Sequence, residues 1–475
     1  MNNQAKKKIV ILGAGIAGLS VGYFLSRTQK YEVTIIEQSN TIGGLCASFF
    51  YHGFTLDHGA HKLYSVIPGV LEQIRVLMGD RLVKLPKKNR IYLQGHLLEY
   101  PLKLGSLLKA MGLRMFIRLG FGYGVSVARH FFSRQTPRSY EEYMIKCFGK
   151  PAYQLVFEPL ADKVWGNPSG LHAEMARTRV PSAGGLDIIL KLLGLKEETA
   201  ETNAEYFYYP HRGFGDWPKM LQEKIELNGG EILSDTRIQC FKKQENRVVE
   251  VLIGSNGMEQ SLPCDYLISS IPLPALSRYI FSQNGKTIEH CVDRLQFRHL
   301  ILVYVAVKRP LVMEDQWIFF PEKKFIFGRI FEQKQMNPEL GPKDQTMICC
   351  DLTCEEESWL WKAEDSSLVK ECIRGLQEAQ LIDPGEVTDS FVKRFRNFYP
   401  RYDLEYMEKM KAAGDQLKQI ENLILTGRLG MYNYNNSDHC FDMGRFISER
   451  LEAGINPKEI WNSLENHVRQ YKIVD

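Results

Sequence analysis

Residues 8–44 read KIVILGAGIAGLSVGYFLSRTQKYEVTIIEQSNTIGG and decide the fold of this chain. The apolar run Lys8–Leu12 predicts a buried parallel strand, Ile16–Ser26 has the apolar spacing of a helix, and Tyr31–Glu37 predicts a second strand. The glycine motif GAGIAG, residues 13–18, connects the first strand to the helix. A strand, a glycine turn, a helix and a strand within about 30 residues form a right-handed βαβ unit.

Each glycine of the motif has its own task. Gly13 permits the tight turn, Gly15 lets the backbone approach a pyrophosphate, and Gly18 lets the helix lie close to the strand. The free N–H groups and the dipole at the start of the helix favour negative charge. Glu37 ends the second strand, where a carboxylate accepts hydrogen bonds from ribose hydroxyls. The sequence therefore predicts a dinucleotide-binding Rossmann unit.

A second glycine pair indicates which dinucleotide is bound. Residues 41–45, TIGGL, follow Glu37 closely and resemble the extended fingerprint of flavoproteins of the glutathione-reductase type. A Gly-Gly pair alone marks only a turn, but in this position the resemblance implies FAD. The chain has no second GxGxxG motif. NAD(P)H, as an external reductant, would therefore bind through another surface or through a partner.

The composition is that of an ordinary globular protein. The chain has 475 residues, 44% hydrophobic and 24% charged, which suffices for about two or three lobes. The net charge of +4 is too small to indicate nucleic acid, although it suits an anionic ligand. The ten cysteines show no paired CxxC motifs. We therefore expect no metal site, and reduced thiols in a cytoplasmic protein.

Two segments bear on membrane contact. Residues Met1–Lys8 are polar and basic, and no small-residue cleavage site follows, so we expect no signal peptide. The apolar stretch Met111–Phe132 is interrupted by Arg114, Arg118 and Arg129, whereas a spanning helix needs about 20 apolar residues with few charges. We expect no transmembrane segment here. A packed or surface amphipathic helix is the first interpretation and loose membrane contact the second.

Helical and strand patterns follow one another along the rest of the chain. The stretch 102–208 is predicted to be mainly helical and contains Ser139-x-x-Glu142, a signal for the start of a helix. Strands are predicted at 247–253, 266–271, 300–307, 317–330 and 423–426, and helices at 367–379 and 440–451.

We therefore expect an α/β fold: a Rossmann-like FAD-binding domain of the glutathione-reductase type, with an inserted helical lobe and a mixed-sheet substrate lobe. The substrate would lie between the lobes, over the flavin. The expected limits are 1–100, 209–290 and 391–475 for the FAD-binding domain, 101–208 for the helical lobe and 291–390 for the sheet lobe.

Further segments between Ile9 and about Leu451 resemble one branch of the flavoproteins, which contains the UDP-galactopyranose mutases and protoporphyrinogen-oxidase-like or amine-oxidase-like homologues. The segments are GFTLDHGAH (53–61), GHLLEYPLK (95–103), 139–149, FEPLADKVWG (157–166), RVP (179–181), YPHRGFG (209–215), 317–320, FGR (327–329) and GRLGMYNYNNSDHCFDMG (427–444). The last is the most specific, because no general physical rule demands that string.

The resemblance implies a set of site residues. Those assigned to cofactor binding are Gly13, Gly15, Ile16, Ala17, Gly18, Glu37, Gly43, Gly44, Leu45, Gly59, Ala60, His61, Gly427 and Arg428. Those assigned to catalysis or substrate binding are His61, Trp165, Arg179, Arg329, Arg428, Tyr434 and Asn436.

The arginines would act on phosphates. By the resemblance, Arg428 contacts the FAD pyrophosphate and the flavin edge, while Arg179 and Arg329 clamp a substrate diphosphate, because a guanidinium is always charged and bidentate. Tyr434 and Asn436 would hold phosphate oxygens or the cofactor edge. The structural alternative for a single arginine is an ordinary surface charge.

Two rings would complete the pocket. His61 would lie near the isoalloxazine and exchange a proton near neutral pH, and Trp165 would form a wall. The structural alternatives are a turn filled by His61 and core packing by Trp165 or Tyr434. For Tyr399-Pro400 the structural alternative is a rigid turn.

Three functions are compatible with the sequence. The first is a nucleotide-sugar pyranose/furanose mutase, in which N5 of reduced flavin is the nucleophile and arginines hold a diphosphate. The second is an FAD-dependent oxidase or dehydrogenase that removes hydride from an amine, a porphyrinogen or an unsaturated lipid. The third is a scaffold with structural FAD. The segment Tyr206-Phe207-Tyr208 is shorter than the uridine-binding segment of the mutases. This difference concerns recognition of the uracil base and not binding of the diphosphate.

Overall fold

The computed structural model describes residues 5–100, 104–132, 136–180, 205–255, 257–281 and 291–473. Its foundation is the predicted βαβ unit. Strand β1 (Lys7–Leu12), helix α1 (Ile16–Ser26) and strand β2 (Tyr31–Ile36) agree with the predicted bounds to within one residue. The strands pair in parallel, with Leu12 beside Ile36, because the apolar run of each is buried on both faces of the sheet.

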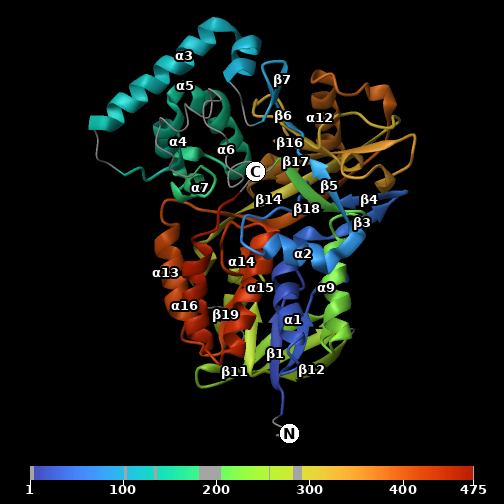
Figure 1. Ribbon diagram of the computed structural model, residues 1–475, viewed down its shortest axis with the longest axis vertical. Helices are drawn as coiled ribbons and strands as arrows, with labels where there is room; N and C mark the ends of the chain where they lie inside the picture. The colour runs from blue at the N-terminus through green and yellow to red at the C-terminus, as the bar shows by residue number, and fades with distance from the viewer. Residues whose placement is uncertain are drawn as a thin grey trace.

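This unit is the centre of a five-stranded parallel sheet, at the bottom of the view in Figure 1. The order of the sheet is β19 (Leu423–Leu425), β13 (Tyr266–Ser269), β1, β2 and β9 (Glu231–Leu233). Helix α1 lies against α9 (Asp216–Leu227) and α15 (Ser437–Glu452). Three distant parts of the chain therefore build the predicted Rossmann-like fold.

The second large element is a seven-stranded sheet. Its order is β18 (Val387–Arg401), β14 (Gln296–Val307), β17 (Thr346–Cys354), β16 (Arg329–Glu332), β15 (Trp317–Phe319), β6 (Asn89–Leu93) and β7 (His96–Glu99). All pairs are antiparallel except β15 with β6. Helix α12 (Asp365–Glu378) covers one face, where Leu368, Cys372 and Leu376 are buried.

Two sequence interpretations of this region need correction. The predicted strand 317–330 is a hairpin, because Pro321 cannot donate a backbone hydrogen bond and the chain turns before β16 returns antiparallel to β15. Strands β6 and β7 precede position 100, and β18 runs through position 390. The expected domain limits at 100 and 390 therefore do not coincide with the limits of the sheet.

The helical lobe contains α3 (Leu104–Phe132), α4 (Tyr140–Phe148), α5 (Lys150–Ala152), α6 (Glu158–Trp165) and α7 (Glu174–Arg177). The predicted helix start is confirmed: the Ser139 hydroxyl accepts the N–H of Glu142, and the Glu142 carboxylate accepts the N–H of Ser139. Helix is not maintained to 208, because Tyr206–Pro210 forms strand β8, paired with β5 (Leu82–Pro86). Residues 181–204, with Pro181 of the RVP segment, lie outside the described residues.

Smaller elements complete the fold. They are β3 (Ser48–Tyr51) with β4 (Phe54–Asp57), the sheet of β10 (Arg237–Gln244), β11 (Arg247–Ser255) and β12 (Met258–Pro263), and helices α2 (Val70–Met78), α10 (Leu273–Phe281), α11 (Trp359–Lys362), α13 (Tyr406–Leu417), α14 (Gly427–Gly430) and α16 (Pro457–Val468). Helix α16 is absent from the sequence interpretation, although Asn456 caps it and Pro457 is its first residue. Within the described ranges, every helix is too short or too polar to cross a bilayer.

Candidate active site

A cavity of about 1200 Å³ lies between the Rossmann-like domain, the helical lobe and the seven-stranded sheet. Its walls include Glu37 from the first, Trp165 from the second and Arg329 from the third. All of the predicted site residues line this cavity except Gly18. The fold therefore brings together side chains that are spread over most of the sequence.

The glycine turn at the end of β1 forms one wall of the cavity. Gly13 has φ +95°, a conformation that only glycine adopts without strain. A Cβ atom on Gly18 would lie 2.0 Å from the carbonyl oxygen of Gly13, so α1 approaches the turn as closely as a glycine allows. A Cβ atom on Gly15 would meet no protein atom within 4 Å. Gly15 thus faces open space, and no side chain caps α1.

Glu37 connects the loops around this turn by hydrogen bonds. One carboxylate oxygen accepts the N–H of Ala14 at 2.9 Å and the other accepts the N–H of Ser39 at 2.9 Å. Each oxygen has a further lone pair for a ligand hydroxyl. The backbone of Gly43 donates to the Ala14 carbonyl at 2.8 Å, and a Cβ on Gly44 would lie 3.3 Å from the Cα of Gly15. The second glycine pair therefore lies against the first motif.

These observations fit a dinucleotide. The uncapped N-terminus of α1 offers backbone N–H groups and the positive end of the helix dipole to phosphates. Glu37 offers a carboxylate to a ribose, and Gly15 leaves room for the pyrophosphate. Gly13, Gly15, Ile16, Ala17, Glu37, Gly43, Gly44 and Leu45 would hold the nucleotide part, and Gly59, Ala60, His61, Gly427 and Arg428 the flavin side.

His61 differs from its predicted chemistry. Its ring stacks on Phe214, with centroids 4.8 Å apart. Burial first, and then the charges of His58, Arg329 and Arg428, lower its pKa to about 3. The interpretation that it exchanges a proton near neutral pH is therefore wrong for this environment. His61 is neutral at pH 7, because protonation would place a cation beside two guanidinium groups.

Acid stability tests this environment of His61. An unfolded histidine has a pKa near 6.5, whereas the pKa of folded His61 is about 3. Between these values the unfolded state binds the additional proton, so stability is present above pH 6.5 and falls as the pH is lowered. In His61→Gln this proton is no longer bound on unfolding. We therefore expect the free energy of unfolding to fall less steeply as the pH is lowered, by up to about 1.4 kcal/mol per pH unit. Urea unfolding between about pH 6 and pH 4 measures it.

The control for this measurement is His96→Gln, because His96 is exposed on β7. It should leave the pH dependence of unfolding as in the unchanged protein. An unchanged dependence in His61→Gln as well would contradict a neutral His61 in the folded protein.

Asp57 holds the segment that carries His61, a role that the sequence interpretation missed. Its carboxylate accepts the Ser48 hydroxyl at 2.5 Å, the Tyr209 hydroxyl, and the N–H of Phe214 at 3.0 Å. Burial raises the pKa of Asp57, and these hydrogen bonds oppose the rise. The motifs GFTLDHGAH and YPHRGFG are therefore joined in space through one carboxylate.

Arg329 enters the cavity from the start of β16 and is paired with Asp351 of β17. Its Nε and Nη2 atoms lie 2.7 and 2.6 Å from one oxygen of Asp351. Burial raises the pKa of Asp351, and the contact with Arg329 opposes that rise. Arg329 is thus fixed in orientation by a carboxylate that sequence reasoning did not find. The antiparallel register of the two strands, with Arg329 opposite Asp351, sets the pair.

Lys163 of α6 stabilises the turn before Arg329. Its ammonium group donates to the carbonyl oxygens of Phe320, Glu322 and Phe327 at 2.6, 2.7 and 2.9 Å. Burial lowers the pKa of Lys163 to about 7. The lysine joins the helical lobe to the β15–β16 hairpin, and so it holds two walls of the cavity in register.

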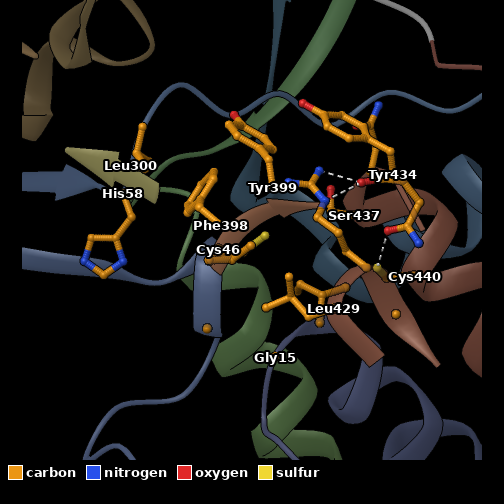
Figure 2. Close-up of a pocket in the computed structure, with 18 of the residues that line it drawn as sticks. Gly15, Cys46, His58, Leu300, Phe398, Tyr399, Leu429, Tyr434, Ser437 and Cys440 are labelled. Carbon is orange, nitrogen blue, oxygen red and sulfur yellow. Dashed lines mark hydrogen bonds between the residues drawn. The ribbon is translucent and has the colours of Figure 1, made fainter. Parts of the chain in front are cut away.

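Four aromatic and cationic side chains form a stack around Tyr434. The Arg179 guanidinium lies 4.5 Å from the ring centroid of Trp165 and 4.2 Å from that of Tyr434. The Arg428 guanidinium lies 5.2 Å from the ring of Tyr434, on which Tyr399 stacks at 5.3 Å and 9°. Figure 2 shows the two tyrosine rings side by side. Each arginine is held by a π-face and keeps donors for a ligand.

Tyr399-Pro400 is not a rigid turn, and that alternative needs correction. Both residues lie in β18, where Pro400 is opposite Phe297. A proline is tolerated there because β18 is the edge strand of the sheet. The strand places the Tyr399 ring in the cavity wall.

The 427–436 loop is internally braced. Arg428 donates to the carbonyl oxygen of Asn435 through Nε and Nη2, at 2.9 and 2.5 Å, which Figure 2 marks with dashed lines. The N–H of Tyr434 donates to the Tyr402 hydroxyl at 2.7 Å. Arg428 is thus oriented by its own loop.

Asn436 begins helix α15 at the cavity wall. It is the N-cap residue, and its N–H donates to Nδ1 of His439 at 3.1 Å. The start of this 16-residue helix therefore adds a second positive helix end to the site. Trp165 is 8% exposed, and its Nε1–H has no acceptor in the part of the chain described here. A buried donor of this kind is satisfied by a ligand or by water.

Comparisons with known proteins agree with this architecture. Residues 11–73 match the family described as NAD(P)-binding Rossmann-like domain. A solved structure of reduced UDP-galactopyranose mutase is similar with a TM-score of 0.81 at 21% identity, over 96% of this chain and 97% of that one. This chain therefore shares the fold of that mutase. No curated protein sequence matches it.

Two further structures share this fold. A putative protoporphyrinogen oxidase from Exiguobacterium sp. 255-15 has a TM-score of 0.69 at 16% identity, over 95% of this chain and 100% of that one. Putrescine oxidase with bound putrescine has a TM-score of 0.61 at 13% identity, over 94% and 99%. A mutase and oxidases both occur among these similar structures, so the site residues must decide between the two chemistries.

Proposed function

We propose that this protein is an FAD-dependent enzyme that rearranges a nucleotide sugar between pyranose and furanose forms. The observation that carries the proposal is the meeting of Arg179, Arg329 and Arg428 in one cavity. They come from the helical lobe, the sheet and the Rossmann-like domain. A site that removes hydride from an uncharged substrate has no need of three guanidinium groups.

The charges support a diphosphate. Arg329 is compensated by Asp351. Within the described ranges neither Arg179 nor Arg428 forms a salt bridge with a carboxylate, and both lie beside Tyr434. Two uncompensated cations match the two charges of a diphosphate ester, and bidentate contacts would fix its orientation. The positive end of α15 adds to the same potential.

The protein's own part would be positioning. Reduced flavin supplies a nucleophilic nitrogen for the anomeric carbon of the sugar. Arg179 and Arg428 would hold the diphosphate as it becomes the leaving group and stabilise its growing charge. Trp165 would form the wall beside the sugar, where its Nε1–H can donate. Neutral His61 would donate or accept a hydrogen bond without adding a charge beside the flavin.

An FAD-dependent oxidase or dehydrogenase is the second candidate, and one wall of the cavity favours it. Leu300, Phe395 and Phe398 line the cavity, and Figure 2 shows Leu300 and Phe398 on the His58 side of Tyr399. An amine or another apolar substrate would fit such a surface. Recognition of uracil has less support, since the segment 206–208 forms β8 outside the lining of the cavity.

The deciding experiment uses purified protein reduced with dithionite and a UDP-sugar. We expect ring isomerisation without consumption of oxygen, detected by chromatography of the sugar. Oxygen consumption with an amine or porphyrinogen, and no isomerised sugar, would favour the second candidate. The absorption spectrum establishes the flavin, and its bleaching by NADPH would identify a nicotinamide reductant.

The arginines are tested by substitution. We expect Arg179→Ala and Arg428→Ala each to raise the KM for the UDP-sugar about tenfold or more, because each removes charge-assisted hydrogen bonds of about 1.5–3 kcal/mol. Arg374→Ala is the control, since Arg374 is an exposed arginine on α12 outside the cavity. Equal effects of all three variants would contradict the proposed diphosphate site.

A further inference from the structure

Helix α3 carries an exposed apolar stripe. Leu113, Ile117, Phe121 and Val125 are 63%, 59%, 74% and 37% exposed. They follow one another at intervals of four residues, so they lie along one side of the helix. Buried positions repeat at this interval in an ordinary surface helix. Here the repeating positions face solvent.

The other side of α3 already has its contacts in the protein. A Cβ atom on Gly122 would lie 2.3 Å from the Pro151 ring, so the helix lies directly against α5. The Ser126 hydroxyl donates to the carbonyl oxygen of Ile145 in α4 at 2.7 Å. Gly122 and Ser126 are on the side opposite the stripe. The stripe is therefore additional to the face that binds the helical lobe.

The charged side chains of α3 all have one sign. The sequence has no Asp or Glu between Glu99 and Glu141. Arg114 and Arg118 are exposed and directly follow Leu113 and Ile117. Arg129 is also exposed on α3, as is Lys109, which precedes the kink of this helix at Gly112. A basic border beside an apolar stripe complements a surface that is negative outside and apolar beneath.

The position of α3 leaves this side accessible. Figure 1 shows it along the outer edge of the helical lobe, far from the parallel sheet. Like the other described helices, α3 does not qualify as a membrane span. A helix with these properties lies in the plane of a bilayer interface, with its apolar side among the acyl chains and its arginines at the headgroups.

We propose that α3 docks this protein on the surface of an anionic lipid bilayer. Ile117 and Phe121 enter the interface, while Arg114 and Arg118 bind lipid phosphates. Because α3 belongs to the lobe that forms one wall of the cavity, docking would hold the enzyme beside the membrane with its Rossmann-like domain directed away. The proposal does not depend on the mutase chemistry.

Vesicle sedimentation of the full-length protein tests the proposal. We expect binding to phosphatidylcholine vesicles that contain phosphatidylglycerol, weaker binding to pure phosphatidylcholine, and loss of binding as salt is raised. Phe121→Glu should reduce the partition coefficient roughly tenfold or more. Arg118→Gln, which replaces an exposed side chain, should reduce it about fivefold.

Phe50→Glu is the matched control, because Phe50 on β3 is also 74% exposed and lies outside α3. It should bind vesicles like the unchanged protein, and circular dichroism melting should show that all variants are folded. Absence of binding to anionic vesicles would overturn the proposal. So would a dimer in solution that Phe121→Glu converts to a monomer, because a second copy would then cover the stripe.

Discussion

Gly15→Ala is expected to give a folded protein that retains less flavin. The backbone of Gly15, with φ −74° and ψ 174°, is one that alanine adopts readily. A Cβ there meets no protein atom within 4 Å, so the methyl group should not disturb packing. It would instead occupy the space beside the start of α1 that the pyrophosphate needs. We expect a loss of flavin affinity of about tenfold or more.

The measurement is the flavin absorbance per protein after purification, together with a titration of added FAD. Gly18→Ala is the informative comparison. Its Cβ would lie 2.0 Å from a backbone oxygen of Gly13, so the strand and helix must separate. Gly18→Ala should therefore lower both thermal stability and flavin content, whereas Gly15→Ala should lower flavin content alone. Full retention of flavin by Gly15→Ala would remove the basis for the dinucleotide site.

Asp351→Ala is expected to destabilise the protein by about 3 kcal/mol, since it leaves the largely buried guanidinium of Arg329, 24% exposed, without its partner. Arg329 lies 2.6 Å from that carboxylate, and Asp351 lies in a central strand of the sheet. Denaturant unfolding measures the loss. Substrate binding should weaken as well, because the guanidinium would no longer be oriented.

Asp365→Ala is the control for this effect. Asp365 pairs with Arg394 on the surface, where its side chain is 58% exposed. An exposed pair contributes about 0–1 kcal/mol, so this variant should unfold nearly like the unchanged protein. A loss for Asp351→Ala no larger than this would show that Arg329 is solvated and that the pair does not organise the site.

The βαβ unit is local in sequence, and this locality explains why it could be predicted. Its strand, turn and helix depend on apolar spacing and on the conformations open to Gly13, Gly15 and Gly18. The capping box at Ser139 is equally local, because its partners are three residues apart. The residues that line the cavity were found through their resemblance to a family, which carries spatial information that a single sequence does not contain.

Strand pairing decided the features that the sequence could not reveal. Asp351 faces Arg329 only through the register of β16 and β17, and Pro400 is tolerated only because β18 is an edge strand.

His61 appears in the sequence as a group that titrates near neutrality. Burial beside Arg329 and Arg428 lowers its pKa to about 3. The apolar residues of α3 suited a packed or a surface helix, and only the tertiary contacts show which side is exposed.

The sequence by itself determined the Rossmann unit and its glycine turn, because both depend on residues close together in the chain. Tertiary structure alone decided the partners of the arginines, the protonation of His61 and the exposed side of α3. These depend on which distant atoms exclude water or oppose a charge, and that becomes defined only when the lobes are assembled.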